Sequence, residues 1–271
     1  MLETMNLFTA VLEREPAVLV TVASTQGSAP RKPGAWMAVF ADTVLGTVGG
    51  GHLEFQAIEE ARRRLLAGEG EMVKRFGLGP SLGQCCGGVM QLRFEPVRAA
   101  DIPALKQRLA PQLAPLALFG GGHVGKALVN ALAPLPYAVR WIDSRDEIFP
   151  PQLPANVATE HSEPVHGAVR ELEPGSRVLI MSFSHAEDLD IVAACLRRWR
   201  EHGDLPYVGL IGSETKWATF RHRLQERGFI PAELARITCP IGLPGIHGKQ
   251  PEVIAASVAA QILLVAPPDI D

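Results

Sequence analysis

The stretch LALFGGGHVGKAL, residues 116–128, decides the fold of the second half of this chain. Its residues Gly120, Gly122 and Gly125 match the pattern G-x-G-x-x-G, which here follows an apolar run and opens a predicted helix. In that pattern the first glycine permits a tight turn, the second lets a phosphate approach the backbone, and the third permits close helix–strand packing. Asp143 ends the next apolar run and could accept hydrogen bonds from a ribose diol. The stretch therefore predicts a Rossmann-type domain.

Strands and helices alternate on the C-terminal side of this turn. The apolar runs predict strands at 116–119, 137–143, 177–183 and 207–212, a weak strand near 156–159, and helices at 123–133, 186–201, 214–227 and 251–265. Such alternation is typical of a parallel sheet with helices on both faces. The first hundred residues differ, because their predicted strands at 17–24, 35–41, 43–48, 71–76 and 89–97 flank a single helix at about 52–67. The predicted fold class is α/β, with an N-terminal α+β domain followed by a C-terminal Rossmann-like parallel-sheet domain.

The length of 271 residues agrees with two domains, at roughly 150 residues each. The segment 99–115 is rich in Ala, Pro, Gln and Leu and includes a short predicted helix at 102–110, so we interpret it as a linker. The predicted domains are accordingly 1–98 and 116–271.

Composition excludes several classes of protein. Apolar residues make up 47% and charged residues 20%, which is typical of a globular chain, and the net charge of −3 gives no general attraction to nucleic acid or anionic membranes. The run Arg62–Arg64 is expected to be a solvated helix face. The N-terminus lacks the positive region of a signal peptide, and the apolar segment 254–266 is too short to span a bilayer. We expect a cytoplasmic protein with reduced thiols, whose four cysteines do not form a disulfide framework.

Three loops of the N-terminal half carry candidate functional residues. Residues 25–34 contain Ser28 and Arg31, whose guanidinium group suits a phosphate or carboxylate, although a plain surface turn is the alternative. Gly49, Gly50 and Gly51 precede a helix and form a second candidate anion site.

The third loop contains the adjacent thiols Cys85 and Cys86 between Gln84 and a glycine pair. A single buried cysteine usually serves packing, whereas an adjacent pair on a glycine-rich loop favours thiol chemistry. The spacing does not fit a zinc site.

The second half offers fewer candidates. His185 lies where a predicted strand ends and a helix begins, so it either faces a ligand or merely neighbours Ser184 at the helix start. Lys216 follows the predicted N-cap Ser213, and a surface lysine is a simpler interpretation than an anion site. Cys195 is expected in the core.

Several segments resemble, in order, those of the xanthine dehydrogenase accessory proteins of the XdhC/CoxI type. They are TQGSAPRKPG (25–34), TVGGGHLE (47–54), QCCGG (84–88), LALFGGGHVG (116–125), WIDSRDEIFP (141–150), SFSHAEDLD (182–190), GLIGSETKWATFRHRL (209–224) and PIGLPGIHGKQPEVIAASVAAQIL (240–263). The resemblance extends from about residue 17 to 265, and QCCGG with SAPR upstream and the C-terminal segment are its most specific parts.

The resemblance implies a maturation factor with no catalytic residue of its own. Such a protein binds molybdenum cofactor, holds it while a cysteine desulfurase supplies the sulfido ligand, and passes it to apo-xanthine dehydrogenase. On this pattern Cys85 and Cys86 contact the cofactor or its sulfur. Arg31, Gly49 to Gly51 and the 120–125 turn are candidates for its phosphate, and no residue is assigned as a metal ligand.

Asp143 leaves alternatives open, because an acid at that position suggests ribose and plain molybdopterin has none. The second domain binds a separate nucleotide, or the cofactor is a dinucleotide form, or the acid only caps the loop at 143–146. Two other functions stay in competition: an NAD(P)-dependent oxidoreductase, and a sulfurtransferase carrying a persulfide on one thiol of the adjacent pair. The apolar C-terminal helix would also allow a homodimer.

Overall fold

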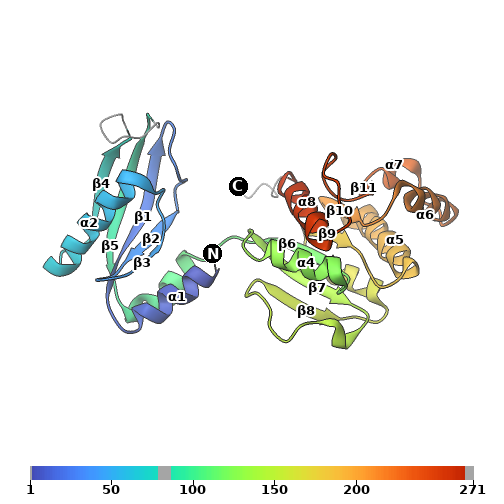
Figure 1. Ribbon diagram of the computed structural model, residues 1–271, viewed down its shortest axis with the longest axis horizontal. Coiled ribbons are helices and arrows are strands. Elements are labelled where there is room, and N and C mark those ends of the chain that lie inside the picture. Colours follow the sequence, from blue (N-terminus) through green and yellow to red (C-terminus); the bar gives the residue numbers. More distant parts are fainter. Residues whose placement is uncertain (1, 79–86, 266–271) are drawn as a thin grey trace. The chain divides into compact units, whose positions relative to one another are not determined.

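The computed structural model describes residues 2–78 and 87–265 (Figure 1). The chain divides into two compact units, Met1–Pro111 and Gln112–Asp271. Together they confirm the predicted fold class, since an antiparallel-sheet unit precedes a parallel-sheet unit.

The N-terminal unit is a five-stranded antiparallel sheet with helices on its two faces. In spatial order its strands are β3 (Val44–Gly46), β2 (Trp36–Val39), β1 (Ala17–Gln26), β5 (Val89–Val97) and β4 (Met72–Gly77). Its helices are α1 (Leu2–Leu12), α2 (Gly51–Ala67), the short 3-10 helix η2 (Ala99–Asp101) and α3 (Ile102–Arg108). All five predicted strands and the predicted helix at 52–67 are present.

Strand β1 shows how the sequence builds both faces of this sheet. Side chains alternate between the faces of a strand, so Val18 and Val20 pack against α2 while Ala17 and Leu19 pack against α1 and α3. Helix α2 contributes the small and apolar residues Leu53, Ala57 and Ala61. Helix α1 was not predicted, although its buried residues Met5, Phe8 and Leu12 have helical spacing.

The segment 99–115, interpreted above as a linker, carries structure that belongs to both units. Helix α3 places Leu105 in the core beneath α1, and strand β6 begins at Ala114. The Ala- and Leu-rich composition that suggested a linker thus reflects partial burial of apolar residues such as Leu105.

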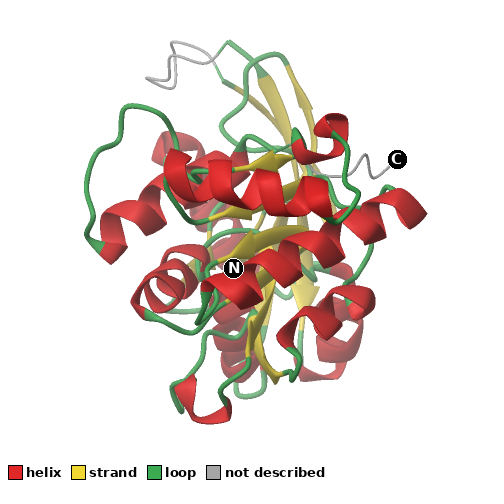
Figure 2. Ribbon diagram, turned by 90° about the vertical axis from the view of Figure 1, so that its right-hand side faces the viewer, coloured by secondary structure: helices red, strands yellow, loops and turns green. Residues whose placement is uncertain are grey.

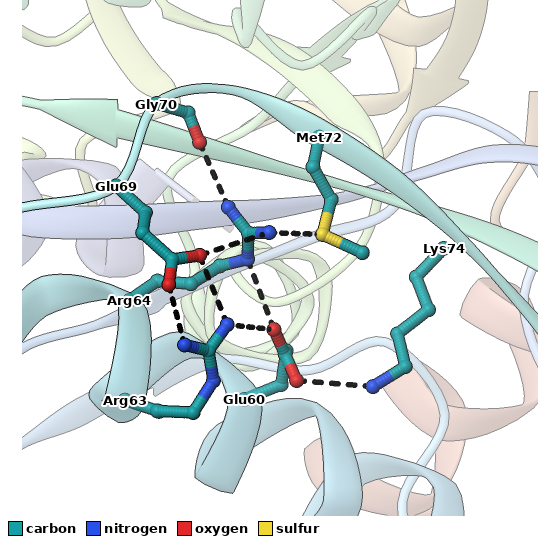
Figure 3. A network of polar contacts seen from close by, with 7 residues as sticks. All are labelled: Glu60, Arg63, Arg64, Glu69, Gly70, Met72 and Lys74. Atoms are coloured by element: carbon teal, nitrogen blue, oxygen red, sulfur yellow. Dashed lines mark hydrogen bonds and ion pairs between the residues drawn. The ribbon is translucent and has the colours of Figure 1, made fainter. Parts of the chain in front are cut away.

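The arginine run on α2 is not a uniformly solvated face (Figure 3). Arg64 is only 8% exposed, and its guanidinium group donates to the Glu60 carboxylate at 3.0 Å, to the Gly70 carbonyl at 2.9 Å and to the sulfur of Met72. Lys74 on β4 contacts the same Glu60 carboxylate at 3.0 Å. The network joins the end of α2 to the adjacent strand, and hydrogen bonds from Arg63 and Lys74 lower the pKa of Glu60 to about 2.

The C-terminal unit is a six-stranded parallel sheet between layers of helices (Figure 2). In spatial order its strands are β11 (Ile237–Thr238), β10 (Tyr207–Leu210), β9 (Arg177–Ile180), β6 (Ala114–Phe119), β7 (Tyr137–Asp143) and β8 (Val157–His161). Its helices are α4 (His123–Leu132), η3 (Asp146–Ile148), η4 (Val165–Glu171), α5 (His185–His202), α6 (Glu214–Glu226), α7 (Pro231–Leu234) and α8 (Pro251–Leu263). Strand order reverses between β6 and β9, and ligands bind at the carboxyl ends of strands at such a point.

Strand β9 is buried on both sides and serves two cores. Val178 and Ile180 face the core under α5 and α6, whereas Leu179, and Met181 directly after the strand, face the core under α4 and α8. A parallel strand covered on both faces has this continuous apolar character, which is why its sequence shows no polar alternation. The elements of the C-terminal unit that the sequence did not predict, η3, η4, α7 and β11, are all short.

Within the described residues, none of the helices combines the length and apolar character needed to cross a membrane.

Candidate functional site

Two of the three fingerprint glycines are required by packing. A Cβ atom on Gly120 would lie 2.0 Å from the Met181 carbonyl oxygen, and one on Gly125 would lie 2.0 Å from the Gly120 carbonyl oxygen. The indole nitrogen of Trp141 donates to that same Gly120 oxygen at 2.9 Å. Gly122, the N-cap of α4, has nothing within 4 Å of its Cβ position. Gly122 is therefore the member of the pattern that leaves room for a ligand.

Asp143, the acid expected to meet a ribose, is bonded within the chain. Its side chain is 1% exposed, and Oδ2 accepts from the Gly121 N–H at 2.6 Å. Both carboxylate oxygens also accept from Arg145, through Nε at 2.8 Å and Nη2 at 2.9 Å. Burial raises the pKa of this carboxyl, but the hydrogen bonds from Arg145 and Gly121 outweigh it and leave the pKa below its usual value. Of the three interpretations of this acid, these contacts favour the one in which it caps the loop at 143–146.

An aromatic ring and a cation lie beside this capped loop. Phe183, which follows β9, is 67% exposed, and the Arg145 guanidinium lies 4.4 Å from its ring centroid. Ser184 caps α5 by accepting from the Glu187 N–H at 3.2 Å. His185 is the exposed first residue of that helix, and its ring meets Phe220 edge-on at 6.3 Å between centroids.

Lys216 is not the surface lysine that the sequence suggested. Its side chain is 12% exposed, and Nζ donates to Asp188 Oδ2 at 2.7 Å and to the Ile211 carbonyl at 2.8 Å. Ser213 caps α6, as predicted, by accepting from the Lys216 N–H at 3.2 Å. The correction has a physical reason: Asp188 is buried on α5, and a buried carboxylate requires a partner cation. Local sequence carries no signal for a pair separated by 28 residues.

In the N-terminal unit the candidate loops converge on one end of the sheet. A Cβ atom on Gly88 would lie 2.3 Å from the Ser28 carbonyl oxygen, so the strand that follows the cysteine pair passes directly beside the 25–34 loop. A Cβ atom on Gly49 would lie 2.5 Å from the Pro30 ring, which places the glycine turn against the same loop. Three segments that are far apart in the sequence therefore meet around residues 28–30.

The glycine turn in this cluster is already occupied by the chain's own acid. Glu54 Oε2 accepts from the Val48 N–H at 3.0 Å, from the Gly50 N–H at 3.1 Å, and from the Thr47 hydroxyl. Burial raises the pKa of Glu54, but these hydrogen bonds outweigh it and the net shift is downward. The Gly50 amide, expected to meet an external anion, is thus bonded to a carboxylate four residues on.

Ser28 and Arg31 are exposed, and among the described residues neither side chain has a polar partner. Cys85 and Cys86 lie outside the described residues; Gly87, the next residue, is exposed. No group of three or more metal-binding side chains occurs in residues 2–78 and 87–265.

The other two cysteines have unreactive surroundings. Cys195 lies in the core, as predicted, and burial raises its pKa to about 12. Cys239 is half-buried, and burial raises its pKa to about 11. Neither thiol is ionised near neutral pH.

Comparisons with known proteins cover both units. Residues 10–77 match the model of the XdhC and CoxI family, and residues 116–262 match the model of the XdhC Rossmann domain. The uncharacterized protein YqeB of Escherichia coli (strain K12) is 29% identical over 274 residues, which is 96% of this chain and 46% of YqeB. The chain thus spans about half the length of this curated relative.

A solved structure from Bacillus halodurans, described as a xanthine dehydrogenase, shares the fold. It is 20% identical, with a TM-score of 0.76 over 97% of this chain and 95% of that one. At this identity the likeness concerns the fold alone, whereas the two family models match the sequence of both units. The chain belongs to the XdhC and CoxI family.

Proposed function

We propose that this protein is an accessory factor in the maturation of xanthine dehydrogenase. In this role it binds molybdenum cofactor, holds it while a cysteine desulfurase supplies sulfur, and inserts it into the apo-enzyme. Family membership supports the accessory role. The observation that carries the binding role is the convergence of the 25–34 loop, the Gly49 turn and Gly88 at one end of the antiparallel sheet.

The residues of this cluster fit the groups that such a cofactor carries. Arg31 and Ser28 are exposed and have no polar partner among the described residues, so they are free to bind its phosphate. Cys85 and Cys86 directly precede Gly87 in the sequence and would supply soft thiolate donors. The bound group would supply the redox chemistry of the target enzyme, and the role of this chain is to hold it and exclude water. The Gly50 amide contributes only after Glu54 is displaced.

Co-purification tests the proposal. The full chain is produced in a host that makes abundant molybdenum cofactor, and bound molybdopterin is quantified per mole of protein. We expect the wild-type chain to retain cofactor and the variants Cys85→Ala/Cys86→Ala and Arg31→Gln to retain about tenfold less. Cys239→Ala is the matched control, because it removes a cysteine outside the cluster.

A second measurement follows delivery, as the activity gained by apo-xanthine dehydrogenase after incubation with the loaded protein and a desulfurase. A wild-type chain that never retains molybdopterin would contradict the proposal. If the double cysteine variant retained as much molybdopterin as the wild-type chain, the two thiols would have no role in holding the cofactor. Titration of the same preparations with NAD and with NADP tests the oxidoreductase alternative. Mass spectrometry for sulfur added to either cysteine tests the sulfurtransferase alternative.

A further inference from the structure

A cavity on the C-terminal unit is lined by none of the residues assigned above to a candidate site. It has a volume of about 540 Å³ and is formed between η4 and the last turns of α5. Its lining residues are Pro164, His166, Gly167, Val169, Arg170, Ala194, Arg197, Arg198, Glu201 and His202. Ligand pockets typically have volumes of about 300–1,000 Å³, so the space suits a small organic molecule.

Cationic side chains dominate the walls of this cavity. Arg170 comes from η4 and Arg197 from α5, while Glu201 is the one acid among the lining residues. Within the described part of the chain, the side chains of Arg170 and Arg197 have neither a hydrogen-bond nor an ion-pair partner. Glu201 approaches His202, at 3.8 Å, rather than either arginine. Two guanidinium groups on opposing elements are therefore available to an anion.

A third arginine makes the cavity a fixed feature of the fold. Arg198 is 8% exposed and donates to the Asp204 carboxylate at 3.0 and 2.6 Å. It also donates to the carbonyls of Val169 at 2.8 Å and Leu172 at 2.7 Å, which ties η4 to α5. Because the chain itself accepts the hydrogen bonds of Arg198, this residue holds the two walls together. Arg170 and Arg197 are the arginines that could bind a ligand.

We propose that this cavity binds a small phosphorylated molecule of about nucleotide size. A guanidinium group matches phosphate oxygens with paired N–H donors, and a phosphorylated molecule carries several such oxygens for the two arginines.

This site is distinct from the Rossmann ligand edge. That edge lies at the start of α5, near His185, and Arg197 is twelve residues further along the helix. At 1.5 Å per residue, the two are about 18 Å apart along the helix axis. The residues that line this cavity also take no part in the proposed cofactor cluster. The two proposals can therefore be tested independently.

Binding of ADP and of inorganic pyrophosphate to the full chain, measured by isothermal titration calorimetry at low ionic strength, tests the inference. We expect the wild-type chain to bind both, and Arg170→Gln/Arg197→Gln to weaken binding about tenfold or more. The matched control is Arg221→Gln/Arg223→Gln. It removes the same charge from exposed α6 residues that have no side-chain partner among the described residues, and it should stay within about twofold of wild type. Thermal melts of both double variants check that the fold is retained.

Three outcomes would overturn the inference. The first is the absence of binding of either probe at millimolar concentration. The second is wild-type affinity in the Arg170→Gln/Arg197→Gln variant, which would place bound ADP elsewhere. The third is an equal loss in both double variants, which would indicate a general charge effect.

Discussion

Replacing Asp143 by alanine removes the carboxylate that joins the glycine turn to the end of β7. The Gly121 N–H would lose its 2.6 Å acceptor inside the protein, where an unpaired donor costs about 1–3 kcal/mol. Arg145 would lose its hydrogen bonds from Nε and Nη2, but its side chain is 36% exposed and can turn to water. Breaking a fully buried ion pair lowers the free energy of unfolding by about 3–5 kcal/mol. Because Arg145 is partly exposed, we expect Asp143→Ala to lower it by less, about 2–3 kcal/mol.

The assay is urea denaturation of the full chain, followed by tryptophan fluorescence. Trp141 is a suitable reporter because its indole donates to the Gly120 carbonyl in the same turn. Asp190→Ala is the matched control: Asp190 also pairs with an arginine, Arg227, at 2.7 Å, but the two side chains are 42% and 39% exposed. The control should lose less than about 1 kcal/mol. If Asp143→Ala loses no more stability than Asp190→Ala, the argument that this carboxylate holds the turn is refuted.

Three further predictions concern other parts of the chain. Gly125→Ala places a Cβ atom 2.0 Å from a carbonyl oxygen and should lower the melting temperature by about 5 °C or more. Gly122→Ala is the control, because its Cβ atom enters open space and should change the melting temperature little. Equal melting temperatures of the two variants would contradict this prediction. The Glu60 carboxyl has a pKa of about 2 in the folded chain against an ordinary value of 4.5, so its contribution is present above pH 4.5 and lost as the pH falls toward 2. Glu60→Gln should therefore be less stable than wild type at pH 6, by about 1 kcal/mol, because Arg63 and Lys74 are 53% and 42% exposed. Acid titration of both proteins should show that this difference in stability vanishes. Finally, iodoacetamide at pH 7.5 should leave Cys195 and Cys239 unmodified in the native protein, since burial raises their pKa values to about 12 and about 11. Peptide mass spectrometry measures the modification, and urea-unfolded protein, in which both thiols should be labelled, is the control.

The regular elements could be predicted from the sequence because each carries its own periodic pattern. Strand β9 appears as a continuous apolar run and α2 as an apolar stripe, and both patterns follow from burial on known faces. The site was less accessible to prediction. Gly120 and Gly125 could be recognised by spacing, but the partner of Asp143 could not, because the same acid serves a ribose in one protein and its own backbone in another.

The remaining features of the candidate sites depend on contacts between segments that are distant in the sequence. The Lys216–Asp188 pair and the meeting of Gly88 with the Ser28 loop depend on how strands are ordered in each sheet, which no local pattern specifies. The cavity beside α5 also depends on tertiary structure, because its lining residues come from η4 and α5, two elements that are separate in the sequence. Local sequence patterns thus identify candidate residues, whereas the topology of each sheet decides which of them lie close together.

The two Gly-Gly-Gly-His turns, at 49–52 and 120–123, each hold a carboxylate of their own, Glu54 in one and Asp143 in the other. A tethered group acts at a high effective concentration, so it competes strongly with any anion from solution. Each internal carboxylate therefore occupies an amide that an anion from solution would otherwise bind, and it keeps that buried donor paired while no ligand is present.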